Sequence, residues 1–144
     1  MEKKIIKIDA NGIVVNPAKE DNLQYIMDCQ RKFQGRFGQD FTKMSDKERV
    51  DFIKTHGYFI IEELVELFRE CPFHKPWKDY SDWSDEKILE QWLTAQEEYI
   101  DVFHFVVNVG IALGLDSNEI LRMYKEKNKV NIERQENPEL GYVK

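Results

Sequence analysis

Two stretches of the sequence carry acidic residues in an otherwise apolar setting. The first reads YFIIEELVELF and contains Glu63 and Glu66, three residues apart. The second reads EEYIDVFHFVVNV and contains Glu98 and Asp101 at the same spacing. Residues three apart lie on one face of a helix, so each pair would present two carboxylates side by side. Burying unpartnered carboxylates is costly, and we therefore expect a cation between the four side chains.

The chemistry of these side chains indicates which cation they would hold. A set of oxygen ligands favours Mg²⁺, or Mn²⁺ in its place, over zinc. Solvated surface acids are the alternative, and for either pair taken alone this is the commoner situation. Asp101-x-x-His104 is also similar to an element of di-iron bundles, but such bundles need a second copy on another helix, and the first stretch has no histidine in register.

A second group of polar residues lies near the C-terminus. Tyr124, Lys127, Asn131 and Arg134 follow one another at intervals of three or four residues, which places them on one face of a helix. An ammonium, an amide and a guanidinium at this spacing are suited to a polyphosphate. A solvated charged face is the commoner fate of such residues and stays open as the alternative.

Four helices are predicted to carry these groups. The first is expected to begin at Asn16-Pro17 and to end near the glycines Gly35 and Gly38. The second is expected to open at Ser45, which forms a capping box with Glu48, and to run to about residue 69. The third is expected between Ser84 and Gly114, after an aromatic-rich loop. The fourth opens with Asp116 and Glu119 and must end before Pro138.

The helices predict an all-α fold, a four-helix bundle, in a single domain spanning residues 1–144. A short N-terminal β-hairpin is expected from Ile5–Ile8 and Ile13–Val15, around an Asn-Gly turn. The two acidic helices are apolar on most of their circumference. A chain of 144 residues cannot cover so much apolar surface alone, so we expect an oligomer.

Composition excludes several classes of function. The 21 basic and 27 acidic residues give a net charge of −6, which argues against binding to nucleic acid or to an anionic membrane. No apolar run is long enough to span a membrane, and the start MEKKIIKID does not resemble a secretory signal. Cys29 and Cys71 do not form a disulfide framework or a zinc motif. These features favour a reduced, cytoplasmic protein.

Taken together and in order, the motifs resemble the all-α dimeric dUTPases of the MazG-like nucleoside triphosphate pyrophosphohydrolase superfamily. The matching segments are QRKFQ at 30–34, ELVE at 63–66, PWK at 76–78, EYIDVFHF at 98–105, and Y-x-x-KN-x-x-N-x-x-RQ at 124–135, followed by Gly141-Tyr142. The ordered set spans nearly the whole chain from Gln30 onward.

The resemblance implies Mg²⁺-dependent hydrolysis of a deoxynucleoside triphosphate to the monophosphate and pyrophosphate. The substrate that the family name implies is dUTP. It implies metal ligands at Glu63, Glu66, Glu98 and Asp101, with Glu63 or Glu66 activating the attacking water. It implies phosphate contacts at Lys127, Asn131, Arg134 and Tyr142. Base and sugar contacts are implied at Gln30, Gln34, Trp77 and His104.

Departures from the family pattern leave alternatives open. Gln34 stands where the family typically has asparagine, which allows another substrate such as dCTP or a purine nucleotide. The chain also lacks helices that longer members insert before the Lys-Asn segment, so we expect a second subunit to complete the pocket, in a homodimer or, failing that, a tetramer. A non-catalytic helical module that binds a protein partner through the aromatic loop is the alternative from another class.

Overall fold

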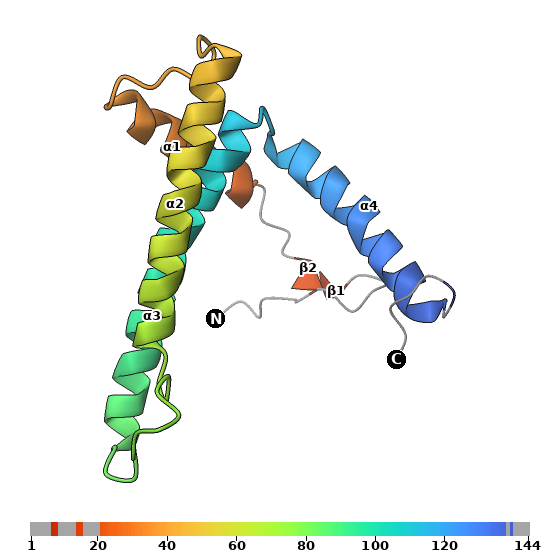
Figure 1. Cartoon of the computed structure of the whole chain (residues 1–144). Coiled ribbons are helices and arrows are strands. Elements are labelled where there is room, and N and C mark those ends of the chain that lie inside the picture. The colour runs from red at the N-terminus through yellow and green to blue at the C-terminus, as the bar shows by residue number, and fades with distance from the viewer. Residues whose placement is uncertain (1–6, 9–13, 16–20, 138, 140–144) are drawn as a thin grey trace, which may run out of the picture.

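The computed structural model describes residues 7–8, 14–15, 21–137 and 139. Its helices are α1 (Asn22–Gly35), α2 (Asp46–Glu70), α3 (Asp85–Ala112) and α4 (Ser117–Glu136), which confirms the all-α class (Figure 1). The short strands β1 (Lys7–Ile8) and β2 (Val14–Val15) pair antiparallel. The Asn-Gly turn predicted between them and the remainder of the expected hairpin lie outside the described residues.

Side-chain caps set where the helices begin. Ser45 caps α2, and its side chain and that of Glu48 bond reciprocally to each other's backbone N–H, as the capping box predicts. Ser84 accepts a hydrogen bond from the Lys87 N–H at the start of α3. These caps satisfy backbone groups that have no partner within the helix, and they confirm the predicted starts of both helices.

The predicted start of the first helix is wrong. Helix α1 begins at Asn22, because Asp21 has extended backbone angles (φ −75°, ψ 95°) and its carboxylate accepts a hydrogen bond from the Gln24 N–H at 3.0 Å. The same carboxylate accepts a hydrogen bond from the Ser117 hydroxyl, which lowers the pKa of Asp21. Asp21 thus ties the first turn of α1 to the first turn of α4, and a helix running on from Pro17 would remove this cap.

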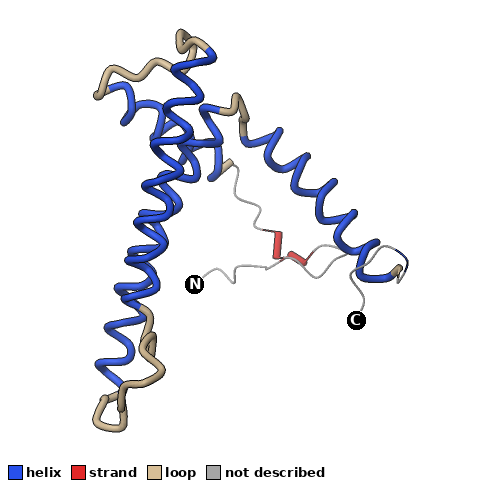
Figure 2. The backbone as a smooth tube through the Cα atoms, in the orientation of Figure 1, coloured by secondary structure: helices blue, strands red, loops and turns tan. Residues whose placement is uncertain are grey.

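Helices α2 and α3 form a long antiparallel hairpin, and α1 packs against the end of α3 that is far from the hairpin loop (Figures 1 and 2). The buried core lies where α1 meets α3 and is formed by Met27, Val107 and Ile111. Partly buried apolar side chains pack around it: Leu23, Ile26, Phe41, Phe103 and Ile120. This core cluster lies at one end of the hairpin, while Ala95 and Val102 are buried further along α3.

Arg49 of α2 fastens the segment after α1 to the end of α3. Its guanidinium donates one hydrogen bond to the Ala112 carbonyl at 2.7 Å and another to the Phe41 carbonyl at 3.2 Å. The first of these satisfies a carbonyl that α3 leaves without an intrahelical partner. Gly114 follows with φ +81°, a left-handed conformation that glycine adopts without strain and that ends the helix.

Helix α4 projects away from the hairpin rather than lying against it (Figure 1). Its axis is bent by 99° from that of α3, and no Cα atom of α4 lies within 8 Å of a Cα atom of α2 or α3. Its first turn contacts α1, and Ile120 reaches the core. The polar face of α4 is consequently separated from α2 and α3 within one chain.

Among the described helices, no single one is both long and apolar enough to cross a membrane. Helices α3 and α4 reach that length and apolar character only when taken together as a bent pair.

Candidate active site

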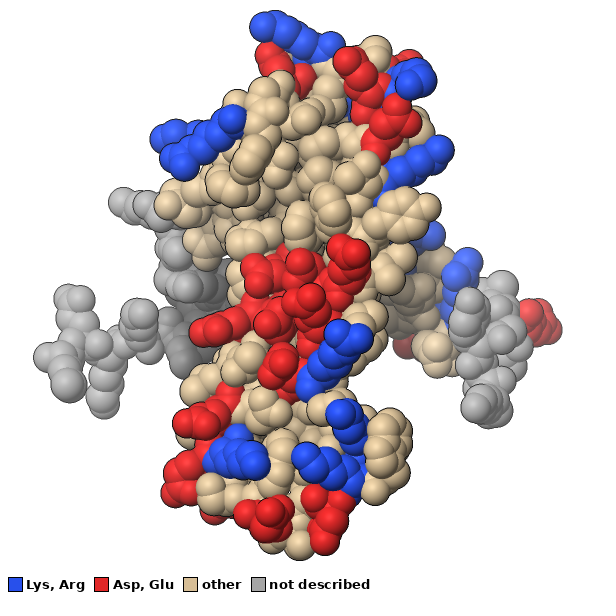
Figure 3. Space-filling model, turned by 60° about the vertical axis from the view of Figure 1, so that its left-hand side comes forward, with Lys and Arg blue, Asp and Glu red and all other residues tan. Residues whose placement is uncertain are grey.

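Acidic side chains gather midway along the α2/α3 hairpin, where they form a compact patch on one face of the molecule (Figure 3). Glu63 and Glu66 come from α2, and Glu98 comes from α3. The three residues each offer a carboxylate oxygen, and these oxygens all lie within 4.8 Å of one another. Because the two helices run side by side, the face of α2 that carries Glu63 and Glu66 lies toward the face of α3 that carries Glu98. We call Glu63, Glu66 and Glu98 the carboxylate cluster.

Asp101, the fourth predicted ligand, lies next to the carboxylate cluster without belonging to the 4.8 Å group. Its Oδ1 is 3.5 Å from Nδ1 of His104, one turn further along α3. Its negative charge nevertheless acts on the carboxylate cluster, since it helps to raise the pKa of Glu63 on α2 and of Glu98 on α3. The predicted four-acid set is thus brought together as three close carboxylates and a fourth at their border.

The surroundings of the carboxylate cluster disfavour the ionised form of its own glutamates. Partial burial raises the pKa of the Glu63 carboxyl, and the charges of Glu66, Asp101 and Glu98 raise it further. Partial burial also raises the pKa of Glu98, with added repulsion from Glu66 and Asp101. None of the ion pairs found among the described residues joins these three glutamates to a lysine or arginine. Close oxygen donors with surplus negative charge fit a small divalent cation such as Mg²⁺.

A cavity of about 710 Å³ opens directly beside the carboxylate cluster, between α1, α2 and α3. Glu63 and Asp101 form part of its wall, and the aromatic side chains of His104 and Phe105 form another part. Its most buried polar lining consists of three carboxamides, those of Gln30, Gln34 and Asn108. We call this space the amide cavity.

The three carboxamides of the amide cavity have no hydrogen-bond partners among the described residues. Gln30 and Gln34 are only 9% and 8% exposed, and Asn108 is 1% exposed. Buried polar groups in folded proteins are nearly always hydrogen-bonded, to protein or to a bound molecule. Three unpaired amides around one cavity are therefore a set of donors and acceptors suited to a polar ligand.

The structure also adds residues that the sequence interpretation did not assign. Lys32 on α1 and Arg36, the residue that caps the C-terminus of α1, line the amide cavity and add positive charge to a wall that also holds Glu63 and Asp101. Asn108 lies seven residues after Asp101 on α3, which is about two helical turns. This spacing places both residues on one helix face and could have indicated Asn108 from the sequence. For Lys32 and Arg36 no signal distinguishes them from ordinary surface cations until α1 is placed against α3.

Other predicted site residues are not brought to the amide cavity within one chain. Trp77 lies in the loop between α2 and α3, is 80% exposed, and does not line the cavity. Lys127, Asn131 and Arg134 lie on the projecting helix α4; Asn131 and Arg134 line a separate pocket of about 470 Å³ there. Tyr142 lies outside the described residues. The roles predicted for these residues stay predictions.

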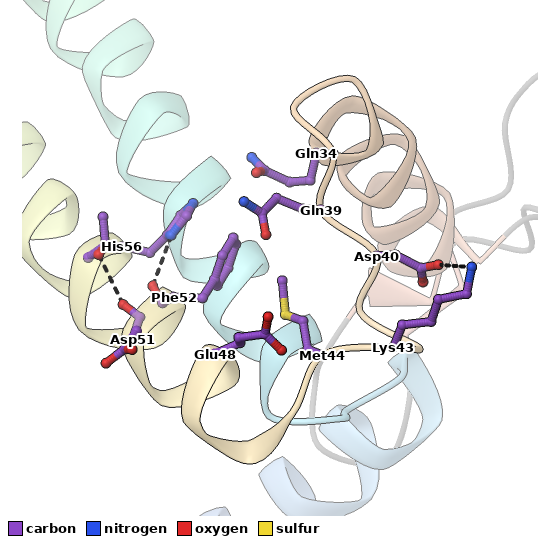
Figure 4. A pocket seen from close by; sticks show the side chains of 11 residues that line it. Gln34, Gln39, Asp40, Lys43, Met44, Glu48, Asp51, Phe52 and His56 are labelled. Atoms are coloured by element: carbon purple, nitrogen blue, oxygen red, sulfur yellow. Dashed lines mark hydrogen bonds and ion pairs between the residues drawn. The ribbon is translucent and has the colours of Figure 1, made fainter.

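A second large pocket, of about 720 Å³, lies between the segment after α1 and the first half of α2 (Figure 4). Gln34 lines both spaces, but several other polar groups of this pocket already have partners. Lys43 pairs with Asp40 at 3.2 Å, and the His56 ring bonds to the Phe52 carbonyl at 3.0 Å while stacking on the Phe52 ring. Burial lowers the pKa of His56 below its usual value. The polar lining of this pocket is therefore mostly satisfied without a ligand.

Comparison with known proteins agrees with this geometry. A family profile described as dUTPase matches residues 22–118, which includes the carboxylate cluster and the amide cavity. A protein of Enterobacteria phage LZ5 named dCTP pyrophosphatase is 32% identical over 142 residues, covering 81% of each chain. The protein of the same name from Enterobacteria phage T4 is 30% identical and covers 83% of each chain. No solved structure matches the chain.

An all-α hairpin that gathers carboxylates beside a ligand-sized cavity, together with these matches, defines the class as nucleoside triphosphate pyrophosphohydrolases of the MazG-like type. Within this class the chain belongs to the all-α dUTPase-like family, whose profile covers two thirds of it.

Proposed function

We propose that this protein hydrolyses a pyrimidine deoxynucleoside triphosphate, dUTP or dCTP, to the monophosphate and pyrophosphate in a Mg²⁺-dependent reaction. One observation carries the proposal: the carboxylate cluster and the amide cavity share a wall, because Glu63 and Asp101 border the cavity. A nucleotide whose base occupies the cavity would hold its phosphates against the carboxylates.

The carboxylate cluster and Asp101 would hold Mg²⁺. When bound, such an ion neutralises negative charge and lowers the pKa of coordinated water. Glu63 is the residue that belongs both to the carboxylate cluster and to the cavity wall, so we assign to it, rather than to Glu66, the orientation and deprotonation of the attacking water. The water oxygen bonds to the α-phosphorus, the bond from that phosphorus to the bridging oxygen breaks, and pyrophosphate leaves.

The cations of α4 support a proposal about assembly. Lys127 and Arg134 would bind phosphates, but α4 does not approach the carboxylate cluster of its own chain. We therefore propose a homodimer in which α4 of one subunit brings Lys127, Asn131 and Arg134 to the site of the other. Trp77, exposed at the tip of the hairpin, would likewise contact a base only across subunits.

Exposed apolar side chains are consistent with this assembly. They occur on α2, α3 and α4: Tyr58, Ile61, Phe68, Trp92, Tyr99, Leu121 and Ile132. Large exposed apolar side chains in this number are unusual on a monomer and are typical of subunit interfaces. The expectation from sequence that one chain cannot cover these helices agrees with the exposure seen in the single chain.

The two substrates named in the proposal have different support. The matching family profile is described as dUTPase, whereas the relatives that align along most of the chain are named dCTP pyrophosphatase. Gln34 lines the amide cavity where the family typically has asparagine, and its longer side chain changes the shape presented to a base. The pyrimidine class is what both sources have in common.

The test is turnover of each deoxynucleoside triphosphate, followed as pyrophosphate release with and without Mg²⁺. We expect dUTP or dCTP to give the highest kcat/KM, and activity to require the metal. Glu66→Gln should abolish turnover with the fold retained, while Glu90→Gln, at an acid of α3 outside the site, should not. Preference for a purine nucleotide would overturn the pyrimidine assignment. Absence of turnover with every nucleotide would favour a helical module that binds a protein partner.

A further inference from the structure

Asn108 is the most deeply buried polar side chain among the described residues, at 1% exposed. Its Oδ1 is the one fully buried side-chain nitrogen or oxygen atom there that lacks a hydrogen-bond partner, whereas the unpaired amides of Gln30 and Gln34 keep some exposure. The carboxamide lines the amide cavity from α3. A fully buried amide that makes no protein hydrogen bond leaves its bonding capacity open to whatever enters the cavity.

We propose that Asn108 is a specificity-determining residue that hydrogen-bonds the substituent at position 4 of a pyrimidine base. This inference rests on the proposed function, since it names the group that reads the base in the same site. The sequence motifs assigned base contacts to other residues, and no role was attached to Asn108.

The position of Asn108 along α3 supports this assignment. Asp101, His104 and Asn108 follow one another at successive turns, all on the wall of the amide cavity. Seven residues of helix rise about 10 Å, so Asn108 lies roughly that far along the axis from Asp101. This is close to the length of a nucleoside monophosphate from its phosphorus to the far edge of its base. With the phosphate at the carboxylate end, the far edge of the base reaches Asn108.

The chemistry of the base identifies the group that would meet Asn108. A pyrimidine is attached to its sugar through ring position 1, and the position directly opposite is 4. That substituent is an amino group in cytosine and a carbonyl in uracil. A carboxamide offers both a donor and an acceptor, and Gln30 and Gln34 supply further unpaired amides for the neighbouring edge atoms.

A cycle of two changes tests the contact, one in the protein and one in the substrate. The substrate change replaces the preferred pyrimidine nucleotide by the pyrimidin-2-one deoxynucleoside triphosphate, which carries only hydrogen at position 4. The protein change is Asn108→Leu, similar in size and without polar atoms. We expect the wild type to disfavour the analogue by about 100-fold in kcat/KM, and Asn108→Leu to abolish most of this discrimination.

A second variant adjusts the polarity of the contact. Asn108→Asp presents acceptors only, which suit the amino group of cytosine and not the carbonyl of uracil. We expect the dCTP/dUTP ratio of kcat/KM to rise at least about 10-fold. The matched control is Asn22→Asp, the same change at an exposed position on α1, which should leave the ratio unchanged.

The outcomes separate this inference from the proposed function. If the wild type hydrolyses a pyrimidine nucleotide, and Asn108→Leu discriminates against the analogue as strongly as the wild type does, Asn108 does not read position 4. A lowered melting temperature with unchanged discrimination likewise assigns Asn108 a purely structural role. If the wild type hydrolyses no nucleotide, the proposed function fails and the inference falls with it. Reduced discrimination in a variant that melts like the wild type supports the inference.

Discussion

Glu63 on α2 and Glu98 on α3 place carboxylate oxygens within 4.8 Å of each other, although they belong to different helices. Burial and mutual repulsion raise the pKa of both. Two negative charges held this close repel each other. Binding of a cation between them, or removal of one of the charges, is therefore favourable. Two predictions depend on this relationship.

The first concerns stabilisation by metal. Mg²⁺ binds the folded carboxylate cluster and not the unfolded chain, so saturating Mg²⁺ should raise the melting temperature; at 100 times Kd the gain is about 2.7 kcal/mol. In Glu98→Gln the gain should fall to a small fraction of this value. Differential scanning fluorimetry over a Mg²⁺ titration measures it. Equal stabilisation of both proteins would show that the metal binds elsewhere.

The second concerns the metal-free protein. Glu63→Gln removes one charge from the carboxylate cluster, so without Mg²⁺ this variant should be more stable than the wild type, while its turnover is lost. Urea denaturation in the presence of a chelator gives the free energies of unfolding. Glu90→Gln, at an exposed acid of α3 outside the cluster, is a suitable control. A less stable Glu63→Gln would contradict the repulsion inferred here.

The third prediction follows from the buried His56. Burial lowers the pKa of its imidazole in the folded state, so below its ordinary pKa, about 6.5, the unfolded chain takes up a proton that the folded chain does not. The stability due to the neutral ring is therefore present above that pH and decreases as the pH falls below it. His56→Phe keeps an aromatic ring against Phe52 and cannot titrate.

The measurement is the free energy of unfolding of both proteins between pH 8 and pH 5, with about 6.5 as the expected onset of the divergence. The wild type should lose more stability than His56→Phe on acidification. The carboxyl groups common to both proteins cancel in the difference. Parallel pH profiles would mean that His56 is protonated as readily in the folded protein as in the unfolded chain.

The fourth prediction tests the contribution of α4 across subunits. Arg134→Ala and Glu63→Gln should each be inactive alone. If the two residues act in the same site from different chains, a mixed dimer has one site with both defects and one with neither. Unfolding and refolding the two variants together should then restore about one quarter of wild-type activity. The same mixture without subunit exchange is the control, and failure to recover activity after verified exchange would place both residues in one chain's site.

The sequence by itself determined the helices and the acidic pairs, because these depend on local interactions. Ser45 and Glu48 form their capping box within one turn, and the spacing of Glu63 to Glu66 fixes a common face as soon as the helix forms. The start of α1 could not be predicted in this way. Asp21 caps that helix while also accepting a hydrogen bond from Ser117, a contact between segments far apart in sequence.

Tertiary structure alone decided how the site is assembled. Only the packing of α2 against α3 brings Glu98 to Glu63, and only the packing of α1 against α3 leaves Gln30, Gln34 and Asn108 unpaired around one cavity. The direction of α4 could not be predicted from the sequence either, because the same pattern of polar residues fits a helix that lies on its own hairpin and one that projects from it. Spacing along a chain fixes which side chains share a helix face, but which faces meet depends on burial and hydrogen bonds between distant segments.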